Sequence, residues 1–316
     1  MSKFSAIVSG LILLSGLSVP AIAKEGPDDL SGIAPFHDRT MVTVCDVKAK
    51  SEKPRLHLVT LSAKGASYIP VEIEYWSPDH QEEVQRASDL EAICQVPGKA
   101  GSFYAFESGY WKGGSGRAFE IAIHHDPERG WVGDVVRVFH PFAKPADGTT
   151  AGHLQIEGAT AFQDGAGQQY LFLGLRGDEN NAGQLVIEKL TDGEVSETER
   201  HSIDLHDLVP EGRSCSELML LQSADNEYSI ICSGCVDSSD VGPFTSTVCD
   251  LGTVEILENG YKLSLKEKPV ELAHIDGFKV ESLTIVYDDQ GRRYICVGTD
   301  DESFAPIFRL LPRKED

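Results

Sequence analysis

One acidic position recurs along the chain in a short, repeated context. In most copies an apolar residue precedes the acid, and a small residue and a second apolar residue follow it. The position falls at residues 31, 91, 157, 217 and 281, with spacings of 60, 66, 60 and 64 residues, and Ser replaces Glu in the first copy. Such spacing predicts equivalent places in a repeated fold. The copies are Leu30-Ser31-Gly32-Ile33, Leu90-Glu91-Ala92-Ile93, Ile156-Glu157-Gly158-Ala159, the looser Ser216-Glu217-Leu218-Met219, and Val280-Glu281-Ser282-Leu283.

Carboxylates at equivalent places around a narrow channel repel one another. At about 6 Å and an effective dielectric constant near 20, each neighbouring pair costs about 2–3 kcal/mol. A bound hard cation offsets this cost, and oxygen ligands favour Ca²⁺, with Mg²⁺ as the weaker candidate. There are three alternatives to a bound cation. A buried Arg, for which Arg176 is the candidate, neutralises the charge, or the carboxyl groups have raised pKa values. In the third, backbone N–H groups donate hydrogen bonds to the carboxylates and no ligand is bound. We predict metal ligands at Ser31, Glu91, Glu157, Glu217 and Glu281.

The elements that must position these residues are short β-strands. About ten residues after each copy comes an apolar, β-rich run that ends in polar residues, and a third and often a fourth run follow. Gly, Asp, Asn and Pro separate the runs, and no long amphipathic helix is evident. Four strands in each of five units predict an all-β, five-bladed β-propeller with mostly four antiparallel strands per blade. A two-sheet sandwich does not explain the fivefold recurrence.

We assign residues 24–316 to a single propeller domain. The last unit ends after its third strand. The ring therefore closes either with a three-stranded last blade or with an N-terminal strand added to that blade.

The ends of the second strands carry another polar set. In a propeller the first strands line the channel, and strand ends open onto one face of the disc. Acids and one Arg at that face would form a polar funnel that could hold a metal-bound anion, although polar residues are also common in solvated turns. The funnel set is Asp46, Glu107, Ser108, Arg176, Asp178, Asp300 and Asp301.

Composition narrows the class of protein. The 316 residues include 28 Lys and Arg against 50 Asp and Glu, a formal charge of −22, and 41% are hydrophobic. This composition excludes a disordered or fibrous chain. The negative charge argues against a nucleic-acid partner and favours attraction of cations.

Residues 1–23 have the pattern of a signal peptide. Lys3 gives a positive start, an apolar stretch runs from Ile7 to Leu17, and Ala21-Ile22-Ala23 provides a small-x-small cleavage site. No later stretch has the 18 or more apolar residues of a transmembrane helix. We therefore expect a periplasmic or secreted protein with no stable membrane insertion after cleavage.

Seven cysteines lie beyond the expected cleavage site, where oxidation can occur. Four of them fall within residues 215–249, which predicts a structural disulfide there. Seven is an odd number, so at least one thiol stays unpaired or pairs between chains. The Cys232-x-x-Cys235 spacing also suits a metal or redox site, but no second ligand pair follows it.

Six segments of the chain carry a resemblance to known proteins. They are 89–93 (DLEAI), 156–158 (IEG), 170–178 (YLFLGLRGD), 183–190 (GQLVIEKL), 280–283 (VESL) and 299–301 (TDD). Through them the chain resembles an uncharacterised family of secreted bacterial propeller-like proteins, a domain of unknown function. The likeness covers most of residues 28–312, and it implies the fold without implying a reaction.

More distantly, the Glu-Gly repeats resemble the esterase-like phytases, and the acidic channel is similar to that of apyrase-type nucleotidases, which hold a central Ca²⁺. The chain lacks the Asp-Asp-Pro-Ala-type metal motif of β-propeller phytases.

Two functions follow from these features. The first is a platform that binds a small anionic or polar ligand through a metal, or a protein partner. The second is a metal-dependent hydrolase of phosphate or carboxylic esters. In that enzyme a channel Glu acts as the base, and Arg176 stabilises developing charge. The candidate catalytic residues are Glu157, Arg176 and Asp178.

Overall fold

The computed structural model contains strands, turns and irregular segments, with no helix among the residues it describes. Consequently no helix in the described part has the length and apolarity of a membrane span. The expected signal peptide, Asp178 and Asp301 lie outside the described residues. Those residues are 27, 29–37, 39–62, 65–77, 82–83, 85–109, 116–142, 155–177, 181–210, 212–236, 242–288, 290–300 and 306–311.

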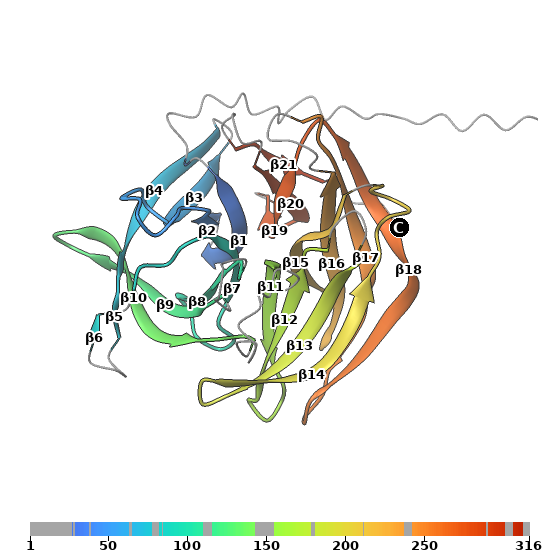
Figure 1. Ribbon diagram of the computed structural model, residues 1–316, viewed down its shortest axis with the longest axis horizontal. Helices are drawn as coiled ribbons and strands as arrows, with labels where there is room; N and C mark the ends of the chain where they lie inside the picture. The colour runs from blue at the N-terminus through green and yellow to red at the C-terminus, as the bar shows by residue number, and fades with distance from the viewer. Residues whose placement is uncertain are drawn as a thin grey trace, which may run out of the picture.

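The strands form blades arranged around a central axis, as the sequence predicts (Figure 1). Each blade is an antiparallel sheet whose strands follow chain order from the axis outward. Blade 1 contains β1 (Leu30–His37), β2 (Thr40–Cys45), β3 (Leu56–Ser62) and β4 (Gly65–Glu74). Blade 2 contains β7 (Leu90–Gln95), β8 (Ser102–Glu107), β9 (Ala118–Asp126) and β10 (Gly130–Phe139).

The remaining three blades repeat this order, and the described part of the last blade has three strands. Blade 3 contains β11 (Ile156–Gln163), β12 (Gln169–Leu175), β13 (Gly183–Thr191) and β14 (Glu194–Ile203). Blade 4 contains β15 (Arg213–Ala224), β16 (Glu227–Val236), β17 (Thr245–Ile256) and β18 (Tyr261–Asp276). Blade 5 contains β19 (Val280–Tyr287), β20 (Arg293–Thr299) and β21 (Phe308–Leu310).

Hydrophobic clusters fill the spaces between neighbouring blades. One cluster lies at each junction, from blades 1 and 2 round to blades 4 and 5. A further cluster packs Ile33 and Met41 of blade 1 against Val286 and Cys296 of blade 5, which closes the ring. Middle strands are thus buried on both faces, and for this reason their sequences are continuously apolar rather than alternating.

The outer edges of blades 1 and 2 are joined as well. β4 and β10 pair in parallel over residues 72–74 and 132–134. A small hairpin of β5 (Trp76–Ser77) and β6 (Glu82–Glu83) lies between the two blades in the chain. The sequence did not predict this seam, because parallel pairing between blades leaves no repeat signal.

Glycine allows the first strands to approach one another at the axis. A Cβ at Gly158 would lie 2.3 Å from the backbone N of Leu218 and 2.6 Å from the carbonyl carbon of Glu217. A Cβ at Gly32 would lie 2.8 Å from the Cα of Ala92. The small residue after the recurring acid therefore provides space for the next blade in these two copies.

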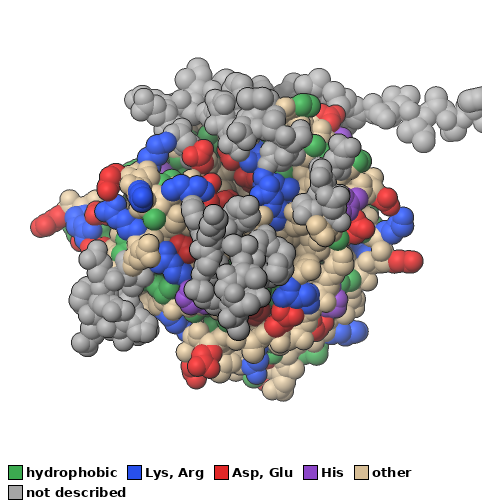
Figure 2. Space-filling model, in the orientation of Figure 1, with side chains coloured by type: hydrophobic (Ala, Val, Ile, Leu, Met, Phe, Trp, Pro, Cys, Tyr) green, Lys and Arg blue, Asp and Glu red, His purple; other side chains and the backbone are tan. Residues whose placement is uncertain are grey.

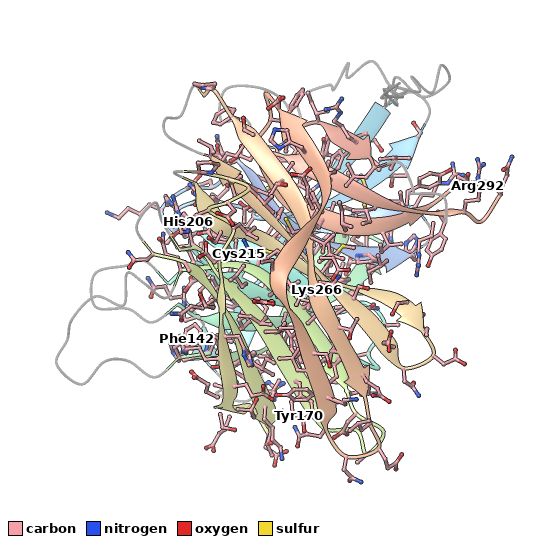
Figure 3. All side chains as sticks on the ribbon, turned by 90° about the vertical axis from the view of Figure 1, so that its right-hand side faces the viewer. Phe142, Tyr170, His206, Cys215, Lys266 and Arg292 are labelled. Carbon is pink, nitrogen blue, oxygen red and sulfur yellow. The ribbon has the colours of Figure 1, made fainter. Side chains whose placement is uncertain are left out.

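The predicted disulfide within residues 215–249 is wrong. All seven cysteines are described and buried, and none forms a disulfide. Cys232 and Cys235 lie three positions apart on β16 and so point to opposite faces of the blade. Cys215, Cys232 and Cys249 pack as apolar side chains between blades 3 and 4, inside the molecule (Figure 3). Burial raises the pKa of Cys249 to about 11, which suppresses its thiolate form.

Gly158→Ala tests the close approach at the axis. Because the new methyl group collides with backbone rather than with a flexible side chain, we expect the free energy of unfolding to fall by about 1–3 kcal/mol. Thermal melting measures this loss. The comparison variant is Gly167→Ala, whose loss of about 1 kcal/mol comes from its positive φ of 86° alone, because no atom lies within 4 Å of the new Cβ. No loss of stability in Gly158→Ala would contradict the crowding at Gly158.

Candidate functional site

The strand register brings four copies of the recurring position and the described funnel residues to one end of the channel. In each blade the start of the first strand lies beside the end of the second. The recurring position is the second residue of β1, β7, β11 and β19, so these four side chains reach a similar level. The pairs that define the register are Leu30 with Cys45, Leu90 with Glu107, Ile156 with Leu175, Arg213 with Cys235, and Val280 with Thr299.

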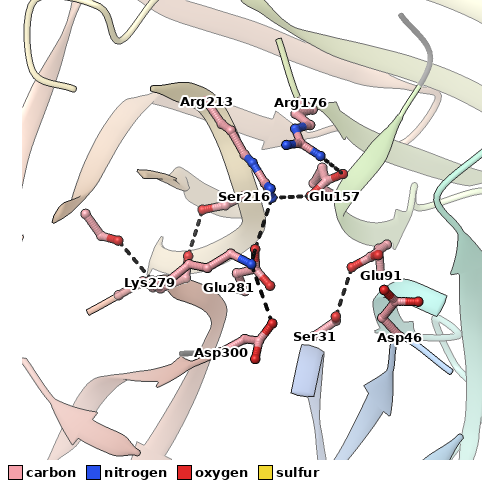
Figure 4. Close-up of polar contacts among 12 residues, drawn as sticks. Ser31, Asp46, Glu91, Glu157, Arg176, Arg213, Ser216, Lys279, Glu281 and Asp300 are labelled. Carbon is pink, nitrogen blue, oxygen red and sulfur yellow. Dashed lines mark hydrogen bonds and ion pairs between the residues drawn. The ribbon is translucent and has the colours of Figure 1, made fainter. Parts of the chain in front are cut away.

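Arg213 connects two of the recurring acids. Its Nη1 lies 3.3 Å from Glu157 Oε2 and 3.1 Å from Glu281 Oε1 (Figure 4). Arg176 approaches the same Glu157 from the end of β12, with Nη1 3.9 Å from Oε1. Burial raises the pKa of Glu157, and the two guanidinium groups oppose that rise. The buried Arg expected from the sequence is therefore mainly Arg213, with Arg176 as a more distant partner.

Lys279 completes this side of the channel. Its Nζ lies 3.1 Å from Glu281 Oε1 and 3.5 Å from Asp300 Oδ2, and its side chain is 4% exposed. Three cations therefore face three carboxylates in what we call the paired half of the channel mouth. The paired half is Glu157, Arg176, Arg213, Lys279, Glu281 and Asp300.

The opposite side has more carboxylates than cations. Asp46, Asp89 and Glu91 each place an oxygen within 4.8 Å of the others, and we call these three residues the acidic half. Ser31 Oγ donates a hydrogen bond to Glu91 Oε2 at 2.9 Å. Among the described residues, Lys48 is the cation that contacts this group, with Nζ 2.7 Å from Asp46 Oδ1 and in contact with Asp89. Two negative charges remain if all three acids are ionised.

The acidic half is electrostatically strained. Burial, together with the hydrogen bond and charge of Asp89, raises the pKa of Asp46 to about 6, while Lys48 opposes the rise. The pKa of Glu91 is raised well above its usual range by burial and by the charges of Glu157 and Asp46. Both carboxyl groups therefore bind protons more readily than exposed acids do, as expected for buried acids with too little positive charge beside them.

Glu217 lies deeper and serves the ring itself. Its Oε1 accepts a hydrogen bond from the backbone N of Leu218 at 2.8 Å, and the backbone amides of Ile33 and Ala159 also favour its ionised form. Its Oε2 is buried with no hydrogen-bond partner in the described residues. Burial raises the pKa of Glu217 well above its usual range despite these amides. This carboxyl group thus connects the first strands of blades 1, 3 and 4.

Two predicted funnel residues serve the blade framework instead. Glu107 accepts hydrogen bonds from the backbone N of Ser88 at 2.9 Å and from Arg117 Nε at 2.9 Å. The backbone of Ser108 connects blades, because its N donates to the carbonyl of Asp89 and its carbonyl accepts from Ile156 N. The structure leaves Asp178 and Asp301 undescribed.

Four residues at the mouth were missed by the sequence reasoning: Asp89, Lys48, Arg213 and Lys279. Asp89 and Lys279 each stand two residues before a recurring acid, and Arg213 stands four before Glu217. A search for charged residues just ahead of each copy would have found three of them. Lys48 follows Asp46 by two residues, and only the structure connects it to Asp89.

Comparison with known proteins bears on the fold. No family model matches the chain, and no curated protein matches it. The chain is similar to an α-L-arabinanase mutant from Cellvibrio cellulosa at 12% identity and a TM-score of 0.50, over 90% of this chain and 92% of that one. An endo-arabinase from Bacteroides thetaiotaomicron has 11% identity and a TM-score of 0.48, over 92% and 99% of the two chains.

At these identities a likeness is one of fold alone. The likeness to the arabinanase mutant supports the predicted propeller. The resemblance to the uncharacterised secreted family, the esterase-like phytases and the apyrase-type nucleotidases stays a prediction.

Glu217→Gln tests the pKa of the buried acid. The folded-state pKa lies above the unfolded one, so the stability that Glu217 contributes is present at low pH and is lost as the pH rises. Gln needs no proton and keeps the acceptor for Leu218. We therefore expect the difference in Tm, variant minus wild type, to increase by several degrees between about pH 5 and about pH 8.

Glu217→Ala is the companion variant. It leaves the Leu218 N–H unpaired and a cavity behind, so it should destabilise the protein at both pH values. A difference between Glu217→Gln and wild type that does not vary with pH would contradict the raised pKa.

Proposed function

We propose that this protein is a ligand-binding β-propeller that holds Ca²⁺ in the acidic half of its channel mouth. Three carboxylates from two neighbouring blades supply hard oxygen donors, and the Ser31 hydroxyl supports one of them. Ca²⁺ tolerates an irregular set of oxygen ligands, whereas Mg²⁺ demands near-octahedral geometry. This site contains fewer ligands than the five that the sequence predicts, because Glu157 and Glu281 already contact Arg213.

The uneven charge balance carries this proposal. Among the described residues, the paired half has three cations for three carboxylates, whereas the acidic half has Lys48 for three carboxylates. A divalent cation that displaces the Lys48 ammonium group would neutralise two of the three carboxylate charges, one more than Lys48 does. Its charge would also oppose the rise that burial causes in the pKa values of Asp46 and Glu91.

The ligand would lie between the cation and Arg176. The Arg176 side chain is 30% exposed, and Glu157 is 3.9 Å away, beyond hydrogen-bonding distance. Figure 2 shows acidic and basic side chains gathered around the upper centre of this face. A small anionic or polar ligand, such as one with a phosphate or carboxylate group, would contact both sides of the mouth. Alternatively, a protein partner would present a phosphate or carboxylate group to the same place.

The expected location is the periplasm or the cell exterior, supported by the signal-peptide pattern of residues 1–23. Sites with Ca²⁺ affinities near 10⁻⁴–10⁻³ M serve extracellular modules. A site that must displace a lysine suits that range.

Millimolar Ca²⁺ should raise the Tm by several degrees near pH 7.5, because binding to the folded state alone adds stability. The rise should shrink near pH 5, below the pKa of about 6 at Asp46, because a proton then competes with the metal. Thermal melts with Ca²⁺, Mg²⁺ and EDTA measure both effects.

Asp89→Asn should abolish the Ca²⁺ effect. The matched control is Asp288→Asn, which removes a carboxylate paired with Arg292 on the surface. An equal Ca²⁺ response in wild type and Asp89→Asn, or an equal response at the two pH values, would contradict this site.

The same mouth supports a second candidate, metal-dependent hydrolysis of phosphate or carboxylic esters. The observation in its favour is that Glu157, an acid of raised pKa, lies beside Arg176. A bound cation would polarise the ester. Glu157 would take a proton from the attacking water, and Arg176 would stabilise the charge that develops on the ester oxygens. Asp178, the third catalytic candidate, lies outside the described residues.

Inorganic phosphate and p-nitrophenyl phosphate distinguish the two candidates. A binding platform should bind phosphate in the presence of Ca²⁺ and bind it about tenfold more weakly in Arg176→Gln, with no turnover of the ester. The hydrolase should release p-nitrophenol and lose about 100-fold or more of that rate in Glu157→Gln, measured at a temperature at which the variant is fully folded. Phosphate binding that is unaffected by Arg176→Gln would contradict both.

A further inference from the structure

A second concave site lies on the rim of the molecule and shares no residue with the channel mouth. It is a groove of about 700 Å³, a volume typical of small-molecule sites. The loop of residues 52–55 and the end of β4 with Tyr75 form part of its wall. Arg86, Arg129 and Trp131 from blade 2 and its approach form the rest.

The groove lies at the seam between two blades. β4 and β10 pair only over residues 72–74 and 132–134, so the preceding part of β4 has no neighbour from blade 2. Pro70 and Ile73 of β4 provide apolar wall here. In Figure 2, Lys, Arg, Asp and Glu side chains are mixed over the left-hand part of the molecule, where β4 and β10 lie in Figure 1.

Each glutamate in the wall of the groove is paired with an arginine. Arg86 Nη1 lies 2.8 Å from Glu52 Oε2. Arg129 Nη2 lies 3.2 Å from Glu72 Oε2, and its other terminal nitrogen contacts Glu74. All three glutamates of the wall therefore have an Arg partner.

The remaining Arg is held by backbone. Arg55 Nε donates to the carbonyl of Ala87 at 2.6 Å, and Nη2 donates to the carbonyl of Lys48 at 2.9 Å. With Lys53, the wall carries four cations and three carboxylates, so its net charge is only +1 and its donors and acceptors lie side by side. An anionic ligand would have to face the three carboxylates, whereas a hydroxyl group both donates and accepts.

A fixed aromatic ring completes the groove. Trp131 makes edge-to-face contacts with Phe36 at 5.5 Å and with His125 at 5.3 Å between ring centroids. These contacts hold the indole in place before any ligand arrives, which lowers the entropy cost of binding. Flat aromatic surface packs against the C–H face of a sugar ring, while paired Arg and Glu side chains contact its hydroxyl groups.

We propose that this rim groove binds a neutral oligosaccharide of two or three rings. The combination of matched Arg–Glu pairs with a fixed Trp131 favours a neutral polyol over an anion or an apolar ligand. The site is independent of the metal and of the channel mouth.

Indole N–H signals in a ¹⁵N–¹H spectrum test the proposal, because the chain has three Trp residues and Trp131→Phe identifies the signal. The probes are xylotriose, cellotriose, maltotriose and mannotriose at about 10 mM, roughly ten times a Kd of about 1 mM. Trigalacturonic acid serves as the anionic probe. We expect at least one neutral trisaccharide to shift the Trp131 signal with saturation, and trigalacturonic acid to shift it less.

Arg129→Gln should weaken this binding about tenfold by breaking both of its ion pairs. Arg292→Gln, which breaks an exposed ion pair elsewhere, should leave it unchanged. Both changes lie on the surface, so the fold should remain. The proposal is overturned by no shift with any neutral probe, by preference for trigalacturonic acid, by binding unaffected by Arg129→Gln, or by binding lost in Arg176→Gln.

Discussion

The convergence of carboxylates at the axis is the constraint on which the rest of the structure depends. Five first strands meet there so closely that Gly158 has no room for a Cβ. Four of them bring a Glu into a space where charge is poorly screened. The chain resolves the repulsion differently at each Glu. Glu157 and Glu281 share Arg213, and Glu217 accepts a hydrogen bond from a backbone N–H group. Glu91 accepts a hydrogen bond from the Ser31 hydroxyl, and Lys48 contacts the neighbouring Asp46 and Asp89.

This uneven solution divides a pseudo-symmetric ring into two chemically different halves. The paired half supplies cations from the first residue of β15, Arg213, and from Lys279 just ahead of β19. The acidic half gathers Asp46 and Asp89 around Glu91, and Lys48 contacts Asp46 and Asp89. A repeated fold thus yields a polar channel mouth whose two halves differ in charge. The propeller's framework supplies rigidity, because apolar clusters separate every pair of blades.

The recurring pattern predicted the fold and the ring of acids because equivalent positions in a repeat share neighbours. It could not predict which cation meets which acid, since Arg213 and Lys279 belong to single blades and have no counterparts in the others. The cysteine spacing misled for a related reason. Nearness in sequence indicated a disulfide, but alternation along β16 directs Cys232 and Cys235 to opposite faces. The rim groove depends on a parallel seam between β4 and β10, which has no sequence signal.

The central claim is that the ring of acids holds a cation in one half only. Anomalous diffraction from crystals of the protein grown with Ca²⁺ and then exchanged with Mn²⁺ or a lanthanide tests it most directly, because these ions share a preference for oxygen ligands. The account predicts one strong peak among Asp46, Asp89 and Glu91, with the Lys48 ammonium group displaced. A peak between Glu157 and Glu281, or an acidic half that keeps Lys48 in place and holds no ion, would contradict it.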